Sequence, residues 1–255
     1  MKNLLKFNNQ EQRDNYTYNI PYVSFIKNID NSYDCGYSDC LECDGWLSSD
    51  GTAYILPGIT TSDEKLRCTV TFINYPQSSG WAILGARDSA TWNTYGSYVV
   101  TKGRLDWSAG GWQGTKYNFE FNTIYTLVCQ KGYYSVNGIE VMKDWKLTEN
   151  SSNPGDEASR NTTPITLPHV IFGINTAETI QPLKQTIQSV KYEYNNEIIR
   201  DMIACRVSKS FYDKSGTLHN IGEVGLYDKI NNILYKNANS SGSFSYSQSW
   251  DYEEV

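Results

Sequence analysis

Glu140 and Asp144 are the acidic residues whose spacing best suits hydrolytic chemistry in this chain. Retaining glycoside hydrolases hold two carboxyl groups about 5–5.5 Å apart, one as the nucleophile and the other as the acid. Residues i and i+4 of a strand share a face, because its side chains alternate with a period of two. The pair follows an Asn137-Gly138 turn, however, and a solvated hairpin end accounts for it without catalysis. A glycoside hydrolase is therefore only the second alternative function.

Other side chains that perform nucleophilic or metal chemistry are sparse. The chain has two histidines, His169 and His219, in unrelated sequence contexts. A Ser-His-Asp triad needs a histidine between a serine and a carboxylate, and a histidine-rich metal site needs several histidines. The sequence also contains no glycine-rich phosphate loop. We therefore predict no catalytic residues and expect that the protein is not an enzyme.

Three of the six cysteines form a C-x4-C-x2-C run, made of Cys35, Cys40 and Cys43. With a fourth, distant cysteine this spacing resembles a plant-type iron–sulfur loop, and Cys68 is an alternative fourth ligand for zinc. The run lacks the usual ferredoxin context, so we predict no metal ligand. The cysteines in strand-like runs read as small buried apolar residues: Cys68, Cys129 and Cys205. Without an export signal, six reduced thiols are expected.

Aromatic and polar residues in turn-rich sequence form the predicted ligand-binding set: Trp92, Tyr95, Asp106, Trp107 and Trp112. An exposed tryptophan ring stacks on the apolar face of a sugar, while carboxylates, amides and backbone groups bind its hydroxyls. The alternative is that these rings fill the core or a protein–protein contact, because tryptophan is usually highly buried. Sugar recognition is predicted only if the rings lie at the surface.

Composition favours strands over helices. The 255 residues include 20 Tyr, 8 Phe and 7 Trp, and only 20% are charged. Aromatic and β-branched residues suit pleated sheets, whereas the long Ala/Leu/Glu/Lys runs of helices are missing. The net charge is -6 without a basic stripe, which argues against nucleic acid as a partner. No apolar run has signal-peptide or membrane-span length, so we expect synthesis in the cytoplasm and no membrane insertion.

Short strands separated by turns recur along most of the chain. Residues 65–74 alternate cleanly, with Leu66 and Phe72 among the residues on the apolar face. A hairpin is expected at 98–107, and the Asn-Gly dipeptide in 133–141 demands the positive φ angles of a type I′ turn. The polar stretch 146–165 is predicted to be a long surface loop. Such a series of strands predicts an antiparallel sandwich.

The chain divides into four predicted segments. Residues 1–34 form an N-terminal unit with a strand near 4–7, a short helix at 9–16 and a strand at 21–26. A unit of this size cannot stabilise itself, so it should dock on the main domain or on a partner. The other segments are a cysteine-containing linker at 35–45, the sandwich at 46–246 and an acidic tail at 247–255.

The closing stretch carries a resemblance to a known family. Its motifs are Arg200-Asp201 followed by Cys205, Gly225-Leu226-Tyr227-Asp228 followed by Asn231-Asn232, and Gly242-Ser243-Phe244. They resemble the end of the laminin-G/concanavalin-A-like jelly rolls of tailed-bacteriophage structural proteins, of the crAss-like, gut-bacterial type. Ala204 stands where the family usually has proline. The Pro21-to-Ile26 stretch resembles an N-terminal strand of the same structural proteins.

The resemblance implies an all-β, antiparallel two-sheet jelly-roll sandwich with a small N-terminal strand–helix–strand appendage. It also implies a non-enzymatic virion component that decorates the capsid or belongs to a fibre or tail, made in the host cytoplasm. The expected partners are other virion proteins, further copies of this chain and host surface glycans. Laminin-G modules also hold calcium, for which Asp88 or Asp106 is available, although we identify no ligand set. The first alternative is a carbohydrate-binding module or adhesin outside a virion.

Overall fold

A computed structural model describes the backbone and side chains of residues 40–43, 45–74, 82–88, 95, 120–151, 154–156 and 162–248. It describes the backbone alone for strand residues 6–7, 25–27, 33–35, 81, 93–94, 96–100, 104–109 and 112–114. The regular elements of these residues are all β-strands, which confirms the predicted all-β class. The helix predicted at 9–16 lies outside the described residues. Within the described ranges, no helix has the length and apolarity needed to cross a membrane.

One layer of the sandwich is a seven-stranded sheet in the order β10-β9-β8-β7-β16-β17, with β15 also paired to β7. Its strands are β7 (Trp81–Asp88), β8 (Asn93–Val100), β9 (Arg104–Ala109), β10 (Trp112–Gly114), β15 (Val170–Ile171), β16 (Gly173–Asn175) and β17 (Ile180–Pro182). Its pairings are antiparallel, except that β16 runs parallel to β7. The β8–β9 pair confirms the hairpin predicted at 98–107.

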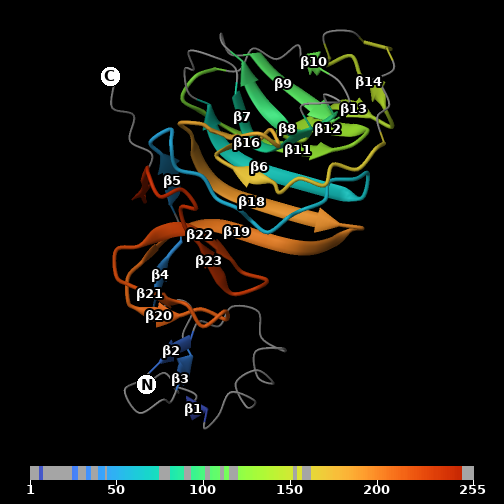
Figure 1. Cartoon of the computed structure of the whole chain (residues 1–255). Helices are drawn as coiled ribbons and strands as arrows, with labels where there is room; N and C mark the ends of the chain where they lie inside the picture. Colours follow the sequence, from blue (N-terminus) through green and yellow to red (C-terminus); the bar gives the residue numbers. More distant parts are fainter. Residues whose placement is uncertain are drawn as a thin grey trace.

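The other layer is a twelve-stranded sheet with the main order β14-β13-β12-β11-β6-β18-β19-β22-β23. Its strands are β4 (Leu41–Glu42), β5 (Trp46–Ser49), β6 (Leu66–Asn74), β11 (Thr123–Gln130), β12 (Tyr133–Val136), β13 (Ile139–Lys143), β14 (Lys146–Leu147), β18 (Thr186–Tyr194), β19 (Glu197–Val207), β22 (Val224–Asp228), β23 (Ile233–Tyr235) and β24 (Phe244–Ser247). Figure 1 shows the long strands β6, β18 and β19 crossing beneath the strands of the seven-stranded sheet. The predicted antiparallel two-sheet sandwich is thereby confirmed.

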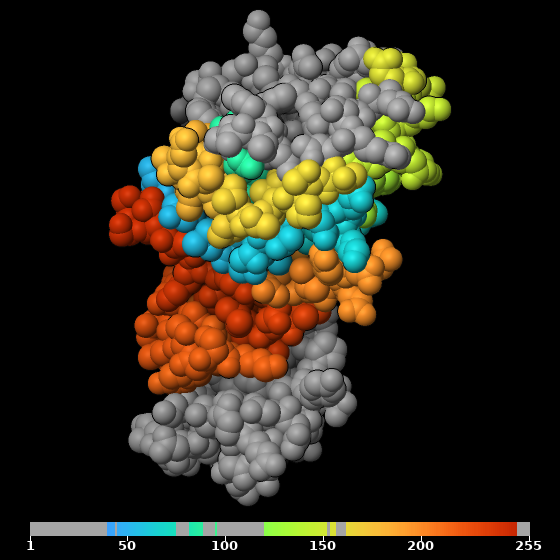
Figure 2. Space-filling model, turned by 45° about the vertical axis from the view of Figure 1, so that its right-hand side comes forward, coloured from blue at the N-terminus to red at the C-terminus, as the bar shows by residue number. Residues whose placement is uncertain are grey.

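A third, five-stranded sheet lies beyond β22 and β23 at the N-terminal end of the molecule (Figure 1). Its strands are β1 (Lys6–Phe7), β2 (Phe25–Lys27), β3 (Tyr33–Cys35), β20 (Phe211–Tyr212) and β21 (Leu218–His219). Strand β2 pairs with β20 through Phe25 and Tyr212. The segment containing β20 and β21 lies below the long strands in Figure 2. The N-terminal strands thus share backbone hydrogen bonds with residues from the closing part of the chain.

The main core lies between the two sandwich sheets. On β6 the side chains of Leu66, Cys68, Val70 and Phe72 are buried in alternation with half-buried polar residues, as the period of two predicted. They pack with residues of the facing sheet, such as Leu84 of β7. Burial of such apolar surface is the dominant favourable contribution to folding. The thiols of Cys68 and Cys129 are buried in this core, as expected for small apolar side chains.

Two hairpins turn through residues with left-handed backbone angles, and the first confirms the predicted Asn-Gly turn. Asn137 and Gly138 have φ angles of 48° and 79°, as a type I′ turn between β12 and β13 requires. Asn195 and Asn196, between β18 and β19, have φ angles of 54° and 66°. Asparagine tolerates this left-handed conformation better than most residues, because its short polar side chain bonds locally.

The expectation of six reduced thiols is wrong, because Cys43 and Cys205 form a disulfide across 162 residues. The pairing of β4 with β19 brings them together: Glu42 lies opposite Arg206, and the cysteines are the next residues along the ladder. Their Cα atoms are 4.3 Å apart. Cys43 is therefore not available as a thiolate ligand for a metal cluster with Cys35 and Cys40.

Two predicted connecting segments contain paired or buried residues. Leu41–Glu42, inside the expected linker, pairs with β19 and therefore joins the large sheet. Within the expected surface loop at 146–165, Leu147 belongs to β14 and is buried, and Ile165 is buried and pairs with Ser62. Apolar side chains spaced through an otherwise polar segment thus anchor it to the sandwich.

Candidate functional site

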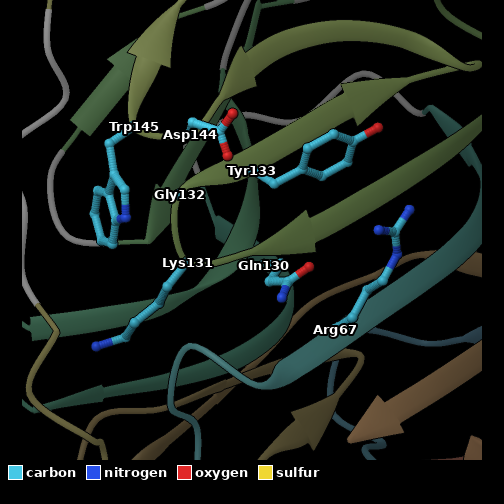
Figure 3. A pocket seen from close by; sticks show the side chains of 7 residues that line it. All are labelled: Arg67, Gln130, Lys131, Gly132, Tyr133, Asp144 and Trp145. Carbon is cyan, nitrogen blue, oxygen red and sulfur yellow. The ribbon is translucent and has the colours of Figure 1, made fainter. Parts of the chain in front are cut away.

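A pocket of about 220 Å³ opens where two turns of the large sheet meet its outer face. It is lined by Arg67, Gln130, Lys131, Gly132, Tyr133, Asp144 and Trp145. Figure 3 shows Arg67 and Tyr133 together on one side of it, with Lys131 and Trp145 toward the other side. Two aromatic rings, two cations, an amide and a carboxylate therefore line one small volume.

The sheet register aligns the first part of this pocket. Gln130 of β11 lies opposite both Arg67 of β6 and Tyr133 of β12. Directly opposite residues of antiparallel strands share a face, and their Cβ atoms are about 4.5–5.5 Å apart. The three side chains thus form a row across three strands. Glu193 of β18 extends the row, because it lies opposite Arg67 on the other side.

Two tight turns build the second part. Lys131 and Gly132 connect β11 to β12, and Asp144 and Trp145 connect β13 to β14. The Trp145 amide donates a hydrogen bond of 3.0 Å to the Gly132 carbonyl, which fastens one turn to the other. A Cβ atom at Gly132 would lie 2.6 Å from Nε1 of the Trp145 indole. Glycine is needed there both for this close approach and for its φ of 78°.

The two cationic side chains of the pocket have different surroundings. The Lys131 ammonium group donates a hydrogen bond of 2.5 Å to the Thr163 carbonyl, and the residue is buried. Burial lowers the pKa of this amine, although the carboxylates of Glu64 and Asp63 oppose the shift. The Arg67 guanidinium is more open and lies over the Tyr133 ring, 4.9 Å from its centroid.

Several polar groups of the pocket have unused hydrogen-bonding capacity. Asp144 is exposed, and no described residue forms a hydrogen bond or ion pair with its carboxylate. The Gln130 side-chain nitrogen donates a hydrogen bond of 2.8 Å to the Glu64 carbonyl. The Gln130 side-chain oxygen accepts no hydrogen bond from any described residue. The Tyr133 hydroxyl likewise has no partner among the described residues. These groups are arranged to accept and donate hydrogen bonds to a polar ligand.

The pocket lining contains none of the predicted ligand-binding residues that the structure describes. Trp92 falls outside the described residues. Asp106, Trp107 and Trp112 lie on the neighbouring strands β9 and β10, where the structure describes only the backbone. The prediction of an exposed ring is wrong for Tyr95, which is fully buried and donates to the Leu66 and Cys129 carbonyls at 2.9 and 2.8 Å. Strand alternation places this residue toward the core, where its hydroxyl needs internal partners.

Glu140 and Asp144 do not form a carboxylate pair on one strand, because only Glu140 belongs to β13. Strand β13 ends at Lys143, and Asp144 follows it with a left-handed φ of 50°. The period of two that would place both residues on one face therefore stops before Asp144. The Glu140 carboxylate instead forms an ion pair with the Lys143 ammonium group at 3.3 Å.

His169 is held in the core beside Ser62. The Ser62 hydroxyl and His169 Nε2 are hydrogen-bonded, while His169 Nδ1 has no partner in the described part of the chain. The imidazole packs against the rings of Tyr95 and Tyr192, at centroid distances of 5.1 and 5.7 Å. Burial lowers its pKa to about 3, so the ring is neutral near pH 7. Without a carboxylate at Nδ1 the pair lacks the orienting group of a catalytic triad.

His219 belongs to a separate charged cluster. Its Nε2 lies 2.9 Å from the Asp213 carboxylate and its Nδ1 lies 3.3 Å from that of Glu223, which also binds Lys236 at 2.9 Å. Burial raises the pKa of Asp213, but hydrogen bonds from His219, Ser215 and Thr217 outweigh this and leave that pKa below its usual value. The Ser215 hydroxyl donates to Asp213 rather than to the histidine. This order of contacts is not that of a nucleophile and its base.

The motif at the closing end of the chain serves the fold. The buried Asp228 carboxylate accepts hydrogen bonds from the amides of Asp201 and Ile230 and from the Asn231 side chain. It thereby caps the turn from β22 to β23 and attaches it to β19. Within the described residues, no three His, Cys, Asp or Glu side chains are placed to hold a metal ion.

Sequence reasoning missed Arg67, Gln130, Tyr133 and Trp145 as site residues. Arg67 and Gln130 were visible only as polar positions of alternating strands, and that pattern does not reveal which strands become neighbours. The Asn-Gly turn at 137–138 did indicate the hairpin that carries Tyr133 and Asp144, but not the turn that faces it. The register of β6, β11 and β12 brings Arg67, Gln130 and Tyr133 side by side and thereby forms the site.

Comparison with known proteins gives little beyond this description. No protein-family model matches the sequence, and no curated protein matches it. A Trypanosoma rangeli sialidase in complex with the inhibitor DANA is similar over 52% of this chain, with 14% identity and a TM-score of 0.36. This chain spans only 20% of that sialidase chain. A heptameric SAP-like pentraxin from Limulus polyphemus is similar over 67% of this chain and 74% of its own, with 11% identity and a TM-score of 0.35. Likenesses at this level assign no function.

Proposed function

We propose that this protein is a non-enzymatic carbohydrate-binding sandwich and that the pocket at Arg67, Tyr133 and Asp144 is its glycan site. The observation that carries the proposal is the meeting, in one pocket of about 220 Å³, of an aromatic ring with polar groups that have no hydrogen-bond partner among the described residues. Ligand sites are concave and place a few polar groups so that they fix the orientation of the ligand.

The chemistry of the lining suits a sugar. A sugar ring carries several hydroxyl groups, each of which can donate one hydrogen bond and accept others. The Asp144 carboxylate and the Gln130 amide oxygen accept such bonds, and the Tyr133 hydroxyl both donates and accepts. The Tyr133 and Trp145 rings supply apolar wall for the carbon atoms of the sugar.

Glycan-array screening followed by isothermal titration tests the proposal. We expect Tyr133→Ala and Asp144→Ala each to weaken binding of any glycan found by about tenfold or more, because each removes a directional contact. Tyr246→Ala is the matched control, because Tyr246 also lies beneath an arginine, at 5.7 Å, but is remote from the pocket lining. Absence of glycan binding, or binding that neither pocket variant weakens, would contradict the proposal.

The same binding measurements also distinguish this pocket from the glycan site that the sequence predicted on the other sheet. If the aromatic residues of β9 and β10 form the glycan site, Trp107→Ala and Trp112→Ala will abolish binding while Tyr133→Ala leaves it unchanged. We expect the reverse pattern. Both sets of variants are measured on the full chain with the same glycan.

A second proposal concerns where the module is displayed. The sequence resemblance to bacteriophage jelly rolls supports a role as a virion component, assembled with other virion proteins and with further copies of this chain. The pairing of β2 with β20 is compatible with an N-terminal unit that mounts the sandwich on such an assembly. Mass spectrometry of purified virions tests this role, and absence of the protein from intact particles would rule it out.

A further inference from the structure

Arg67 presents a guanidinium group that makes no hydrogen bond to any residue in the described ranges. Its Nε lies 3.7 Å from a Glu193 carboxylate oxygen. The two groups form an ion pair, but the distance is too long for a hydrogen bond. Its guanidinium carbon lies 4.9 Å from the centroid of the Tyr133 ring. No described residue accepts a hydrogen bond from it, and its side chain is 38% exposed. The group is thus held in place by a ring and a charge, and its N–H groups have no hydrogen-bond acceptor among the described residues.

Two other arginines of the sandwich, Arg206 and Arg200, are used differently. Arg206 also lies over a tyrosine ring, that of Tyr246, but its Nε and terminal nitrogen donate to Glu42 at 3.0 and 2.6 Å. The Arg200 guanidinium donates to the carbonyl oxygens of Pro57 and Ile199. These two groups serve the fold through their hydrogen bonds, whereas Arg67 makes none to the residues that the structure describes.

The neighbours of Arg67 determine which ligand suits it. A guanidinium binds a carboxylate through two parallel N–H···O bonds, because the two planar groups match in geometry. A fully ionised inorganic anion such as sulfate would bond to Arg67 but has no hydroxyl group to donate to the Asp144 carboxylate in the same pocket. A sugar that carries a carboxylate gains from both, since its carboxylate binds Arg67 while its hydroxyls donate to Asp144 and Gln130.

We propose, building on the glycan site proposed above, that the pocket selects carboxylate-bearing sugars and that Arg67 is the residue that recognises the carboxylate. Glu193 positions Arg67 and also competes with the ligand for its charge. Glu193 is shared with Lys191, whose ammonium group lies 3.5 Å from it, so the competition for Arg67 is partial.

Titration of the full chain with matched oligosaccharides tests the inference. The probes are an oligosaccharide ending in glucuronic acid, the same oligosaccharide ending in glucose, and a sulfated form of the latter. We expect the carboxylate form to bind at least about tenfold more tightly than the other two, as one bidentate charged contact provides. Added salt should weaken binding of the carboxylate form and leave the neutral form unchanged.

Two variants, with one matched control, test whether Arg67 causes the preference for the carboxylate form. Arg67→Gln should remove the preference and keep the weaker binding of the neutral form, while Arg206→Gln, the matched control, should keep the preference. Glu193→Gln should raise affinity for the carboxylate form severalfold, because it removes the competing charge and retains Arg67. This second variant tests the inference even if Arg67→Gln folds poorly.

The outcomes separate the inference from the function on which it rests. Equal binding of acidic and neutral sugars, or a carboxylate preference that survives in Arg67→Gln, overturns the inference while the glycan site stands. A preference for the sulfated form also overturns it, because it would identify an anion site without need of the carboxylate geometry. Binding of no glycan by the unmodified protein overturns the proposed function itself.

Discussion

The carboxylate of Asp50 accepts two hydrogen bonds from Ser243, one from its backbone amide at 2.7 Å and one from its hydroxyl at 3.1 Å. The other carboxylate oxygen accepts bonds from Thr52 and Ala53, which closes the turn after β5. One side chain therefore fastens the opening turn of the sandwich to a residue 193 positions later. It reinforces the antiparallel pairing of β5 with β24 that follows.

Replacing Asp50 should lower the melting temperature of the sandwich. Asp50→Ala removes the acceptor for every one of these bonds, and Asp50→Asn should have a smaller effect because it keeps one acceptor oxygen. Asp156→Ala is the control, since Asp156 is an exposed aspartate whose side chain forms no hydrogen bond or ion pair with any described residue. Differential scanning calorimetry checks the order of melting temperatures, and equal values for the alanine variants would contradict the assigned role.

The same contacts give Asp50 a pH signature. Hydrogen bonds from Thr52, its amide first and then its hydroxyl, lower the pKa of Asp50 well below its ordinary value. A lowered folded-state pKa stabilises the fold above the unfolded-state pKa of about 3.9, and this contribution is lost as the pH falls further. We expect the stability difference between the protein and Asp50→Asn to shrink below about pH 4. Urea titrations at pH 3 and pH 6 measure this difference.

His169 should make the fold sensitive to mild acid. Burial lowers its pKa to about 3 from an ordinary value of 6.5. The unfolded chain therefore binds a proton that the folded chain does not in this range, so stability is complete above about pH 6.5 and falls as the pH drops. The contribution amounts to about 3 kcal/mol between pH 7 and pH 4.

The double variant Ser62→Ala, His169→Phe isolates this effect. It removes the titrating ring together with its hydrogen-bonding partner and keeps an aromatic ring between Tyr95 and Tyr192. We expect its urea-unfolding free energy to lack the portion of the pH dependence that His169 causes. A pH profile parallel to that of the unmodified protein would show that His169 is already protonated, or is solvated, in the folded state.

The Cys43–Cys205 disulfide should be a large contributor to stability. A cross-link that closes a loop of 162 residues strongly restricts the unfolded chain. We expect reduction, or Cys43→Ser, to cost about 2–5 kcal/mol in guanidinium unfolding. A reductant should have no further effect on Cys43→Ser, which serves as the internal control. Equal stability of oxidised and reduced protein would mean that the bond is not formed in solution.

Gly138 offers a test of the turn that positions the pocket hairpin. Its φ of 79° is unfavourable for alanine, while nothing lies within 4 Å of a Cβ placed there. Gly138→Ala should therefore cost about 1 kcal/mol through backbone strain alone, and Gly138→Asn should cost less because asparagine tolerates this conformation. Chemical denaturation measures both variants. Equal losses of stability in the two variants would contradict backbone strain as the cause.

Local signals in the sequence determined the strands and turns of this protein. The alternation in 66–72 placed one side of β6 in the core, and the dipeptide at 137–138 placed a hairpin, because these patterns act between near neighbours. The Arg200-Asp201 and Tyr227-Asp228 stretches belong to the motifs from which a jelly roll was expected, and the hydrogen bond from the Asp201 amide to the Asp228 carboxylate joins them. Each of these features depends on a period or a turn that a few residues specify.

Only the tertiary structure decided which distant residues meet. The disulfide, the Ser62–His169 contact and the Asp50–Ser243 contact each join residues more than a hundred positions apart, and no local pattern specifies such partners. The pocket depends on the same property, since Arg67, Gln130 and Tyr133 become neighbours through the register of β6, β11 and β12. Strand order and register follow from packing of the whole core, so alternation predicted that these side chains face outward but not what they face.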